Sequence, residues 1–128
     1  MRFAKLVFSI AGVWGMLVLT PVYFMFASLS RQYPPQITHP EFYDGFAGVT
    51  FAWQVAFFVI ARDPVRFRPI MVAAVLEKFS YGATVSVLYT QGRLYAGQLA
   101  WGGPDLVWGF LFLAAFLKTS SDGARRGP

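Results

Sequence analysis

The sequence predicts an all-α integral membrane protein, a four-helix bundle with short loops and both termini in the cytoplasm. Of its 128 residues, 56% are hydrophobic and only 13% are charged, whereas a soluble domain carries about 25% charged residues. The apolar residues gather in runs whose ends are polar or basic. Because one crossing takes about 20 residues, a chain of this length has room for about four membrane helices in a single domain.

The first crossing is expected over residues 6–29. Its apolar run follows Arg2 and Lys5 and holds about 24 residues, which is longer than the core of about 7 to 15 residues in a signal peptide. We therefore expect this helix to be retained. Pro21, near its outer end, is expected to kink the helix because proline removes one backbone hydrogen bond.

The second and third crossings are expected over residues 43–61 and 69–90. The polar, proline-containing stretch SRQYPPQITHPEFYD precedes them as an outer loop. Between them lies the short basic turn RDPVRFRP, in which Asp63 and Pro64 are suited to cap and begin a helix. Because this turn is short, the two helices are expected to be antiparallel neighbours.

The fourth crossing is expected over residues 104–118, followed by a polar tail over residues 119–128. The apolar part of this helix holds only about 12 residues, fewer than a crossing usually needs. The helix is therefore expected either to include part of the preceding connection, residues 91–103, or to cross a locally thin region of the bilayer.

The distribution of basic residues predicts the orientation, because lysine and arginine are enriched on the cytoplasmic side of membrane proteins. Arg31 and Arg93 lie at the outer ends of the expected helices, and Lys78 lies within one. The other eight basic residues all fall at the opposite end: Arg2, Lys5, Arg62, Arg66, Arg68, Lys118, Arg125 and Arg126. Both termini are therefore expected to be cytoplasmic.

Residue types that most catalytic and cofactor sites require are scarce. The chain has no cysteine and one histidine, and it has neither a glycine-rich phosphate loop nor a Ser/His/Asp set. The spacing of His39, Glu41 and Asp44 matches no metal site, so no metal and no cofactor are expected. The basic residues border apolar runs rather than forming a basic face, which argues against nucleic acid as a partner. An intramembrane enzyme using Glu77 as a general acid or base is the less favoured interpretation.

Glu77 is the leading candidate for a functional residue, because an ionisable group inside a membrane helix costs about 2.5 to 3.5 kcal/mol and needs a partner. It lies about 10 Å beyond Ile70, where the third helix is expected to enter the lipid. Gln54 lies at a similar depth on the second helix, with Thr50 one turn away. We therefore expect the Gln54 amide to hydrogen-bond the Glu77 carboxyl group.

Three further polar residues, Ser80, Tyr81 and Thr84, follow Glu77 at the i+3, i+4 and i+7 positions of one helix face. This face is expected to look into the bundle. Lys78 is rotated by about 100° and is expected to extend toward the cytoplasm rather than to pair with Glu77.

Three interpretations of this polar cluster remain open. It is either a buried hydrogen-bond network that sets the helix register, or a polar pocket for a ligand headgroup or a proton, or a surface through which Glu77 faces another subunit.

The segment His39–Arg93, HPEFYDGFAGVTFAWQVAFFVIARDPVRFRPIMVAAVLEKFSYGATVSVLYTQGR, resembles a family of small, uncharacterised bacterial inner-membrane proteins with four helices. Its general plan is similar to that of DoxX-like proteins, although none of their functional motifs is present. The resemblance implies a multi-pass protein of the bacterial inner (plasma) membrane and implies no particular activity.

These features together predict a non-catalytic inner-membrane protein that binds a lipid or an apolar small molecule, or that acts as an accessory subunit of a larger membrane complex. The alternative is a proton-coupled transporter or channel that uses Glu77. It would work as a homo-oligomer, because a single four-helix bundle is small for an alternating-access path.

Overall fold

The described part of the chain is helical. The computed structural model describes residues 2–32 and 36–125, and no strand occurs among them. Residues 33–35 of the expected outer loop and residues 126–128 of the expected tail lie outside the described residues. The elements in order are α1 (Arg2–Phe24), α2 (Phe26–Gln32), α3 (Pro40–Arg62), α4 (Arg68–Thr90), the 3₁₀ helix η1 (Ala96–Gln98) and α5 (Leu99–Arg125).

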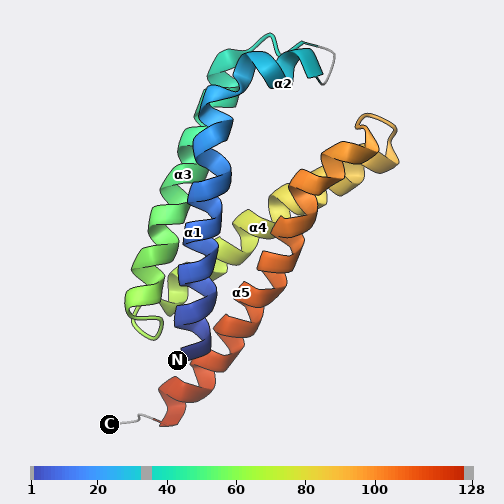
Figure 1. Cartoon of the computed structure of the whole chain (residues 1–128). Coiled ribbons are helices and arrows are strands. Elements are labelled where there is room, and N and C mark those ends of the chain that lie inside the picture. Colours follow the sequence, from blue (N-terminus) through green and yellow to red (C-terminus); the bar gives the residue numbers. More distant parts are fainter. Residues whose placement is uncertain (1, 33–35, 126–128) are drawn as a thin grey trace.

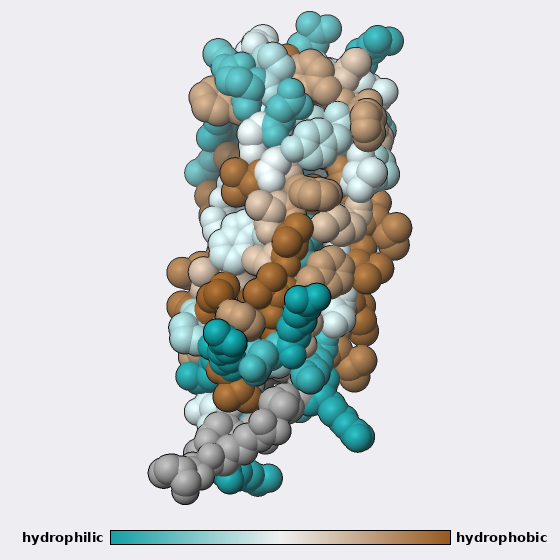
Figure 2. Space-filling model, turned by 90° about the vertical axis from the view of Figure 1, so that its left-hand side faces the viewer, coloured by the Kyte–Doolittle hydropathy of each residue, from teal (hydrophilic) through white to brown (hydrophobic). Residues whose placement is uncertain are grey.

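Four helical stretches are long and apolar enough to cross a membrane. They are Arg2–Phe24, Pro40–Arg62, Arg68–Thr90 and Ala96–Ser120. Figure 2 shows one face of the molecule, on which hydrophilic side chains gather toward the two ends and hydrophobic ones lie between them. The predicted all-α, four-helix architecture is confirmed, and its composition is that of a multi-pass membrane protein.

The four long helices form two hairpin-like pairs. Helix α1 packs mainly against α3, and α4 packs mainly against α5. The two pairs lie together near the chain termini and diverge toward the other end, where the short helix α2 lies across the end of α1 (Figure 1). Helices α3 and α4 contact each other far less than each contacts its own partner. The short turn between them therefore does not produce the close helix pair that the sequence predicts.

The first and last long helices differ most from their expected bounds. The first long helix ends at Phe24, three residues after Pro21, and the chain restarts as α2. Pro21 cannot donate a backbone hydrogen bond to Leu17 O, so the turn that precedes it has one hydrogen bond fewer. The last helix begins at Leu99, after a 3₁₀ turn closed by the hydrogen bond from Tyr95 N to Gln98 Oε1, 2.8 Å. It therefore includes part of the preceding connection, and it continues to Arg125 through most of the expected polar tail.

The main hydrophobic core lies in the half of the molecule nearest the termini. Its centre is a cluster of three fully buried rings, in which Phe8 stacks on Phe112 at 4.3 Å and Phe57 meets Phe112 edge-on at 4.8 Å. The other buried members are Ala4, Val7, Ala11, Ile60, Met71, Ala74 and Ala115. All four long helices contribute, so this core is what joins the two pairs.

Small residues let α4 and α5 approach closely. A Cβ atom added to Gly102 would lie 2.8 Å from Val85, and one added to Gly109 would lie 2.9 Å from Phe79. At Gly102 the contacted atom is the Cβ of Val85, so a larger residue there would push the two helices apart, whereas at Gly109 the Phe79 ring would have to move. In a membrane, where burying apolar side chains supplies no driving force between helices, such close packing is a principal source of association. It places α4 and α5 in the register that forms the site described next.

Candidate functional site

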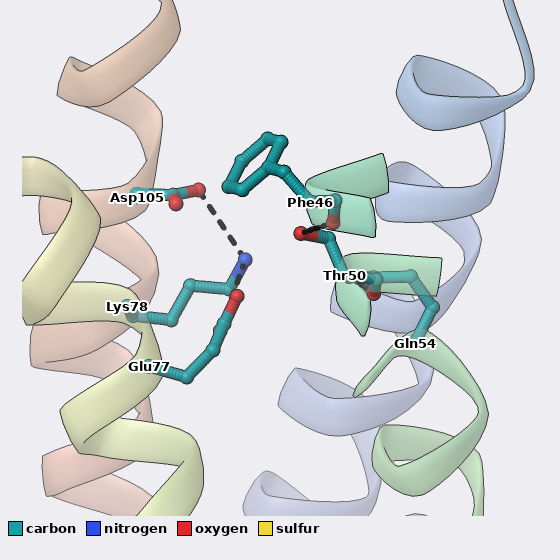
Figure 3. A network of polar contacts seen from close by, with 6 residues as sticks. All are labelled: Phe46, Thr50, Gln54, Glu77, Lys78 and Asp105. Atoms are coloured by element: carbon teal, nitrogen blue, oxygen red, sulfur yellow. Dashed lines mark hydrogen bonds and ion pairs between the residues drawn. The ribbon is translucent and has the colours of Figure 1, made fainter. Parts of the chain in front are cut away.

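A charge triad of Glu77, Lys78 and Asp105 lies between α4 and α5. Lys78 Nζ donates a hydrogen bond to Asp105 Oδ1 at 3.3 Å and lies 3.6 Å from Glu77 Oε2. The side chains of Lys78, Glu77 and Asp105 are only 7%, 15% and 19% exposed. Figure 3 shows the ammonium group of Lys78 directed at Asp105, with the Glu77 carboxylate beside it.

Lys78 is buried because it lies on the face of α4 that packs against the rest of the protein. The buried residues of this helix are Met71, Ala74, Lys78, Gly82 and Val85. Their spacing of three and four residues defines one stripe along the helix. Ala74 and Gly82 lie one helical turn to either side of Lys78, and their small size leaves room for the lysine side chain. Lys78 therefore points into the interface, and the expectation that it extends to the cytoplasmic surface is wrong.

The surroundings of the triad are aromatic as well as charged. Lys78 Nζ lies 5.4 Å from the centre of the Phe57 ring on α3, a distance at which the negative face of the ring attracts a cation. Phe46, also on α3, lies 5.5 Å from Tyr81 on α4, measured between ring centres. These two aromatic contacts connect the α1–α3 pair with the α4–α5 pair at the level of the triad.

One oxygen of the triad has no hydrogen-bond donor. Glu77 Oε2 is fully buried, and no hydrogen bond reaches it from the described residues. The Lys78 ammonium group donates to Asp105 instead. With all three groups ionised, the triad carries two negative charges and one positive charge. A buried charge is stable only when it is paired and hydrogen-bonded, so Glu77 is the less satisfied of the two carboxyl groups.

Gln54 does not join this cluster. It is 1% exposed, its Nε2 donates to Thr50 O at 2.9 Å, and its carboxamide packs directly on Gly15 of α1. The hydrogen bond expected between Gln54 and Glu77 is therefore absent. The Gln54 side chain faces α1, within the α1–α3 pair, and not the α4–α5 pair that holds Glu77. Thr50 lies between these two regions on α3 and donates its hydroxyl to Phe46 O at 2.7 Å (Figure 3).

The polar residues that follow Glu77 on α4 do not share one inward face. Ser80 and Thr84 are exposed, and the Thr84 hydroxyl donates to Ser80 O within the helix at 2.8 Å. Tyr81 is half-buried and faces Phe46. Of the six residues that the sequence singled out, Glu77 and Tyr81 lie at the triad, while Gln54, Ser80 and Thr84 point elsewhere and Thr50 borders it from α3.

Asp105 is the residue that the sequence prediction missed. The sequence places it at the start of the fourth crossing, expected from residue 104, whereas α5 begins at Leu99, six residues before Asp105, which therefore lies inside the helix. Two signals could have found it. Lys78 needed a counter-ion, and Lys78 shares its helical stripe with the small residues Ala74 and Gly82, which mark a helix interface in a membrane. Asp105 directly precedes the last apolar run of the chain.

Other features of the described surface lie away from the triad. One shallow hollow is bordered by Arg2, Lys5, Leu6 and Ser9 on α1. Another follows the C-terminal end of α4 and is bordered by Ala83, Thr84, Val87, Leu88, Gln91 and Arg93. Within residues 2–32 and 36–125, no group of three or more His, Asp or Glu side chains is arranged to hold a metal ion.

The four long apolar helices indicate a multi-pass helical membrane protein, in which a charge triad is buried between α4 and α5. Comparisons with protein-family models, with curated proteins and with solved structures found no match to the chain.

Proposed function

We propose that this chain is a non-catalytic protein of the bacterial inner membrane that binds a lipid or another apolar small molecule between its two helix pairs. The divergence of the pairs away from the common core is the observation that supports this proposal (Figure 1). Apolar side chains of α3 on the diverging half, among them Phe46 and Val49, are 47% and 62% exposed. A selective site on this exposed apolar surface would hold one molecule in preference to the bulk lipid.

The resemblance of His39–Arg93 to four-helix inner-membrane proteins is consistent with this location. In the structure this segment comprises α3, the basic turn and α4. It therefore contributes one helix to each pair and includes the Phe46–Tyr81 contact that joins them.

Native mass spectrometry of the protein released from its own membrane tests the proposal. We expect a retained molecule of defined mass that is lost in Phe46→Ala, because Phe46 is an exposed ring that contacts Tyr81 of the other pair. The matched control is Phe51→Ala, which removes another exposed ring of α3. Absence of any retained molecule from the unaltered protein, or equal retention in both variants, would contradict binding at this place.

The alternative is that this chain is an accessory subunit of a larger membrane complex and contacts its partner through the same exposed apolar surface. In that case, the unaltered protein would leave the membrane in a stoichiometric complex and carry no retained small molecule. Cross-linking from a cysteine placed at Phe46, in a chain that has no other cysteine, would then reach the partner subunit.

A second function, proton-coupled transport by a homo-oligomer, is favoured by one observation, the buried and incompletely satisfied carboxyl group of Glu77. Ionisable residues in membrane interiors commonly mark proton pathways. This function predicts proton flux in proteoliposomes that Glu77→Gln abolishes and that Glu41→Gln, on the exposed start of α3, leaves unchanged. Equal flux in liposomes with and without the protein would exclude it.

A further inference from the structure

The charge triad carries a net negative charge when all three of its groups are ionised. Lys78 supplies one positive charge, whereas Glu77 and Asp105 supply two negative charges when both are ionised. Lys78 is about nine-tenths buried, so its side chain does not carry its charge out to water. An excess charge in an apolar interior is costly, and buried groups commonly avoid this cost by changing their protonation state.

The neighbours of the triad do not supply the missing positive charge. On α4, Tyr81 follows one turn after Glu77, and on α5 the charged member is Asp105 itself. From α3, the contacts are the rings of Phe57 and Phe46, on Lys78 and Tyr81 respectively. Among the described residues, Lys78 is the only cation with an ion pair to either carboxylate.

The hydrogen bonds distinguish the two carboxyl groups. Lys78 Nζ lies 3.3 Å from Asp105 Oδ1 and donates to it, whereas it is 3.6 Å from Glu77 Oε2. Glu77 Oε2 is also the buried oxygen that receives no hydrogen bond. A proton on Glu77 would remove the excess charge and leave the shorter Lys78–Asp105 pair intact.

We propose that the charge triad holds one exchangeable proton and that Glu77 is the residue that binds it. At neutral pH, Lys78 and Asp105 then form a permanent ion pair, and Glu77 is a neutral carboxylic acid beside them. This assignment does not rest on either proposed function, because a protonated Glu77 is compatible with a binding protein as well as with a transporter.

Infrared spectroscopy of the protein in lipid nanodiscs at neutral pH tests the proton count directly. A protonated carboxyl group has a carbonyl stretching band that is separate from the carboxylate bands. This band shifts in frequency when the protein is transferred to D₂O. We expect one such group in the unaltered protein and none in Glu77→Gln. Asp105→Asn should also show none, because Lys78 then balances an ionised Glu77. Lys78→Met should show two, because no cation remains.

Isotope labelling of the unaltered chain tests the location without any substitution. The band should move when the side-chain carboxyl carbon of glutamate is labelled with ¹³C, and should stay when that of aspartate is labelled. Glu41→Gln, an exposed residue paired with His39, serves as the control and should leave the band unchanged.

Three results would overturn the proposal. They are absence of the band from the unaltered protein, its persistence in Glu77→Gln, and its movement with aspartate labelling alone. Should Lys78→Met not fold, the labelled unaltered protein and Glu77→Gln still decide the outcome.

Discussion

Lys78 of α4 and Asp105 of α5 form a hydrogen-bonded ion pair in the apolar part of the chain, with 3.3 Å between Nζ and Oδ1. Twenty-seven residues of sequence separate them. The pair connects two helices whose glycines already hold them close together, at Gly82, Gly102 and Gly109. Close packing and ion pairing therefore act at the same interface. Both form in the same register of α4 against α5.

Loss of this ion pair should be measurable as a coupling energy. Because Lys78 and Asp105 contact each other directly, Lys78→Ala and Asp105→Ala should be non-additive, with a coupling of about 1 to 3 kcal/mol in the free energy of unfolding. Equilibrium unfolding in mixed micelles provides the four values of the cycle. A lysine that extended to the membrane surface would show no coupling. Asp44→Ala, an exposed aspartate of α3, provides a control cycle with Lys78 that should be close to additive.

Gly15→Ala should weaken the α1–α3 pair. A Cβ atom at position 15 would occupy the space of the Gln54 carboxamide, and overpacking of this kind costs about 1 to 3 kcal/mol. Combining Gly15→Ala with Gln54→Ala should restore most of the loss in thermal unfolding, because the obstructing side chain is then gone. Gly45→Ala is the matched control, since a Cβ atom there meets nothing within 4 Å. Equal effects of the two glycine substitutions would show that helix propensity, and not packing, is responsible.

Arg68→Lys should destabilise the end of the molecule near the termini, although it keeps the charge. Arg68 Nε donates to Phe116 O at 3.2 Å, and the guanidinium carbon lies 3.7 Å from the centre of the Phe116 ring. Lysine cannot reproduce both the planar stacking and the directed hydrogen bond. We expect a loss of about 1 to 2 kcal/mol.

The control for this substitution is Arg66→Lys. Arg66 is exposed, and its guanidinium carbon lies 5.6 Å from the centre of the neighbouring Phe67 ring. Exposed substitutions of this kind usually change stability by less than about 0.5 kcal/mol. Comparable losses for the two arginines would mean that the contact between Arg68 and α5 contributes nothing.

Single-cysteine labelling should establish the orientation, because the chain has no cysteine of its own. The excess of basic residues near the termini predicts a cytoplasmic location for that end. A cysteine in place of Thr38, in the exposed segment before α3, should react with a membrane-impermeant thiol reagent in intact spheroplasts. One in place of Arg66, in the exposed turn before α4, should react only after lysis. The reverse pattern would refute the predicted topology.

Composition and periodicity were sufficient to predict the architecture. The long apolar runs, their basic ends and the prolines predict four long helices, and the structure has them. These features are local, because a membrane helix satisfies its own backbone hydrogen bonds and needs only enough apolar length. The start of α5 was the weak point, since Gly102, Gly103 and Pro104 look like a helix break in the sequence. In the structure they form its first turns.

The polar site shows what could not be read from local pattern. Glu77 is largely buried beside Lys78, but its polar neighbours Ser80 and Thr84 are exposed and indicated the wrong face of α4. In water, polar residues face outward and apolar residues inward, whereas in lipid both sides of a helix can be apolar. The interface is then marked by small residues instead, and on α4 these are Ala74 and Gly82, which share a stripe with Lys78.

The sequence by itself determined a membrane protein of four long apolar helices with its basic residues concentrated at one end. Only the tertiary structure decided that Lys78 is an interior residue, that Asp105 is its partner, and that Gln54 belongs to the other helix pair. The physical reason is that helix formation depends on neighbouring residues, whereas the pairing of charges depends on which helices touch and in what register. That register is set by close contacts such as Gly102 with Val85, between residues that are distant in the chain.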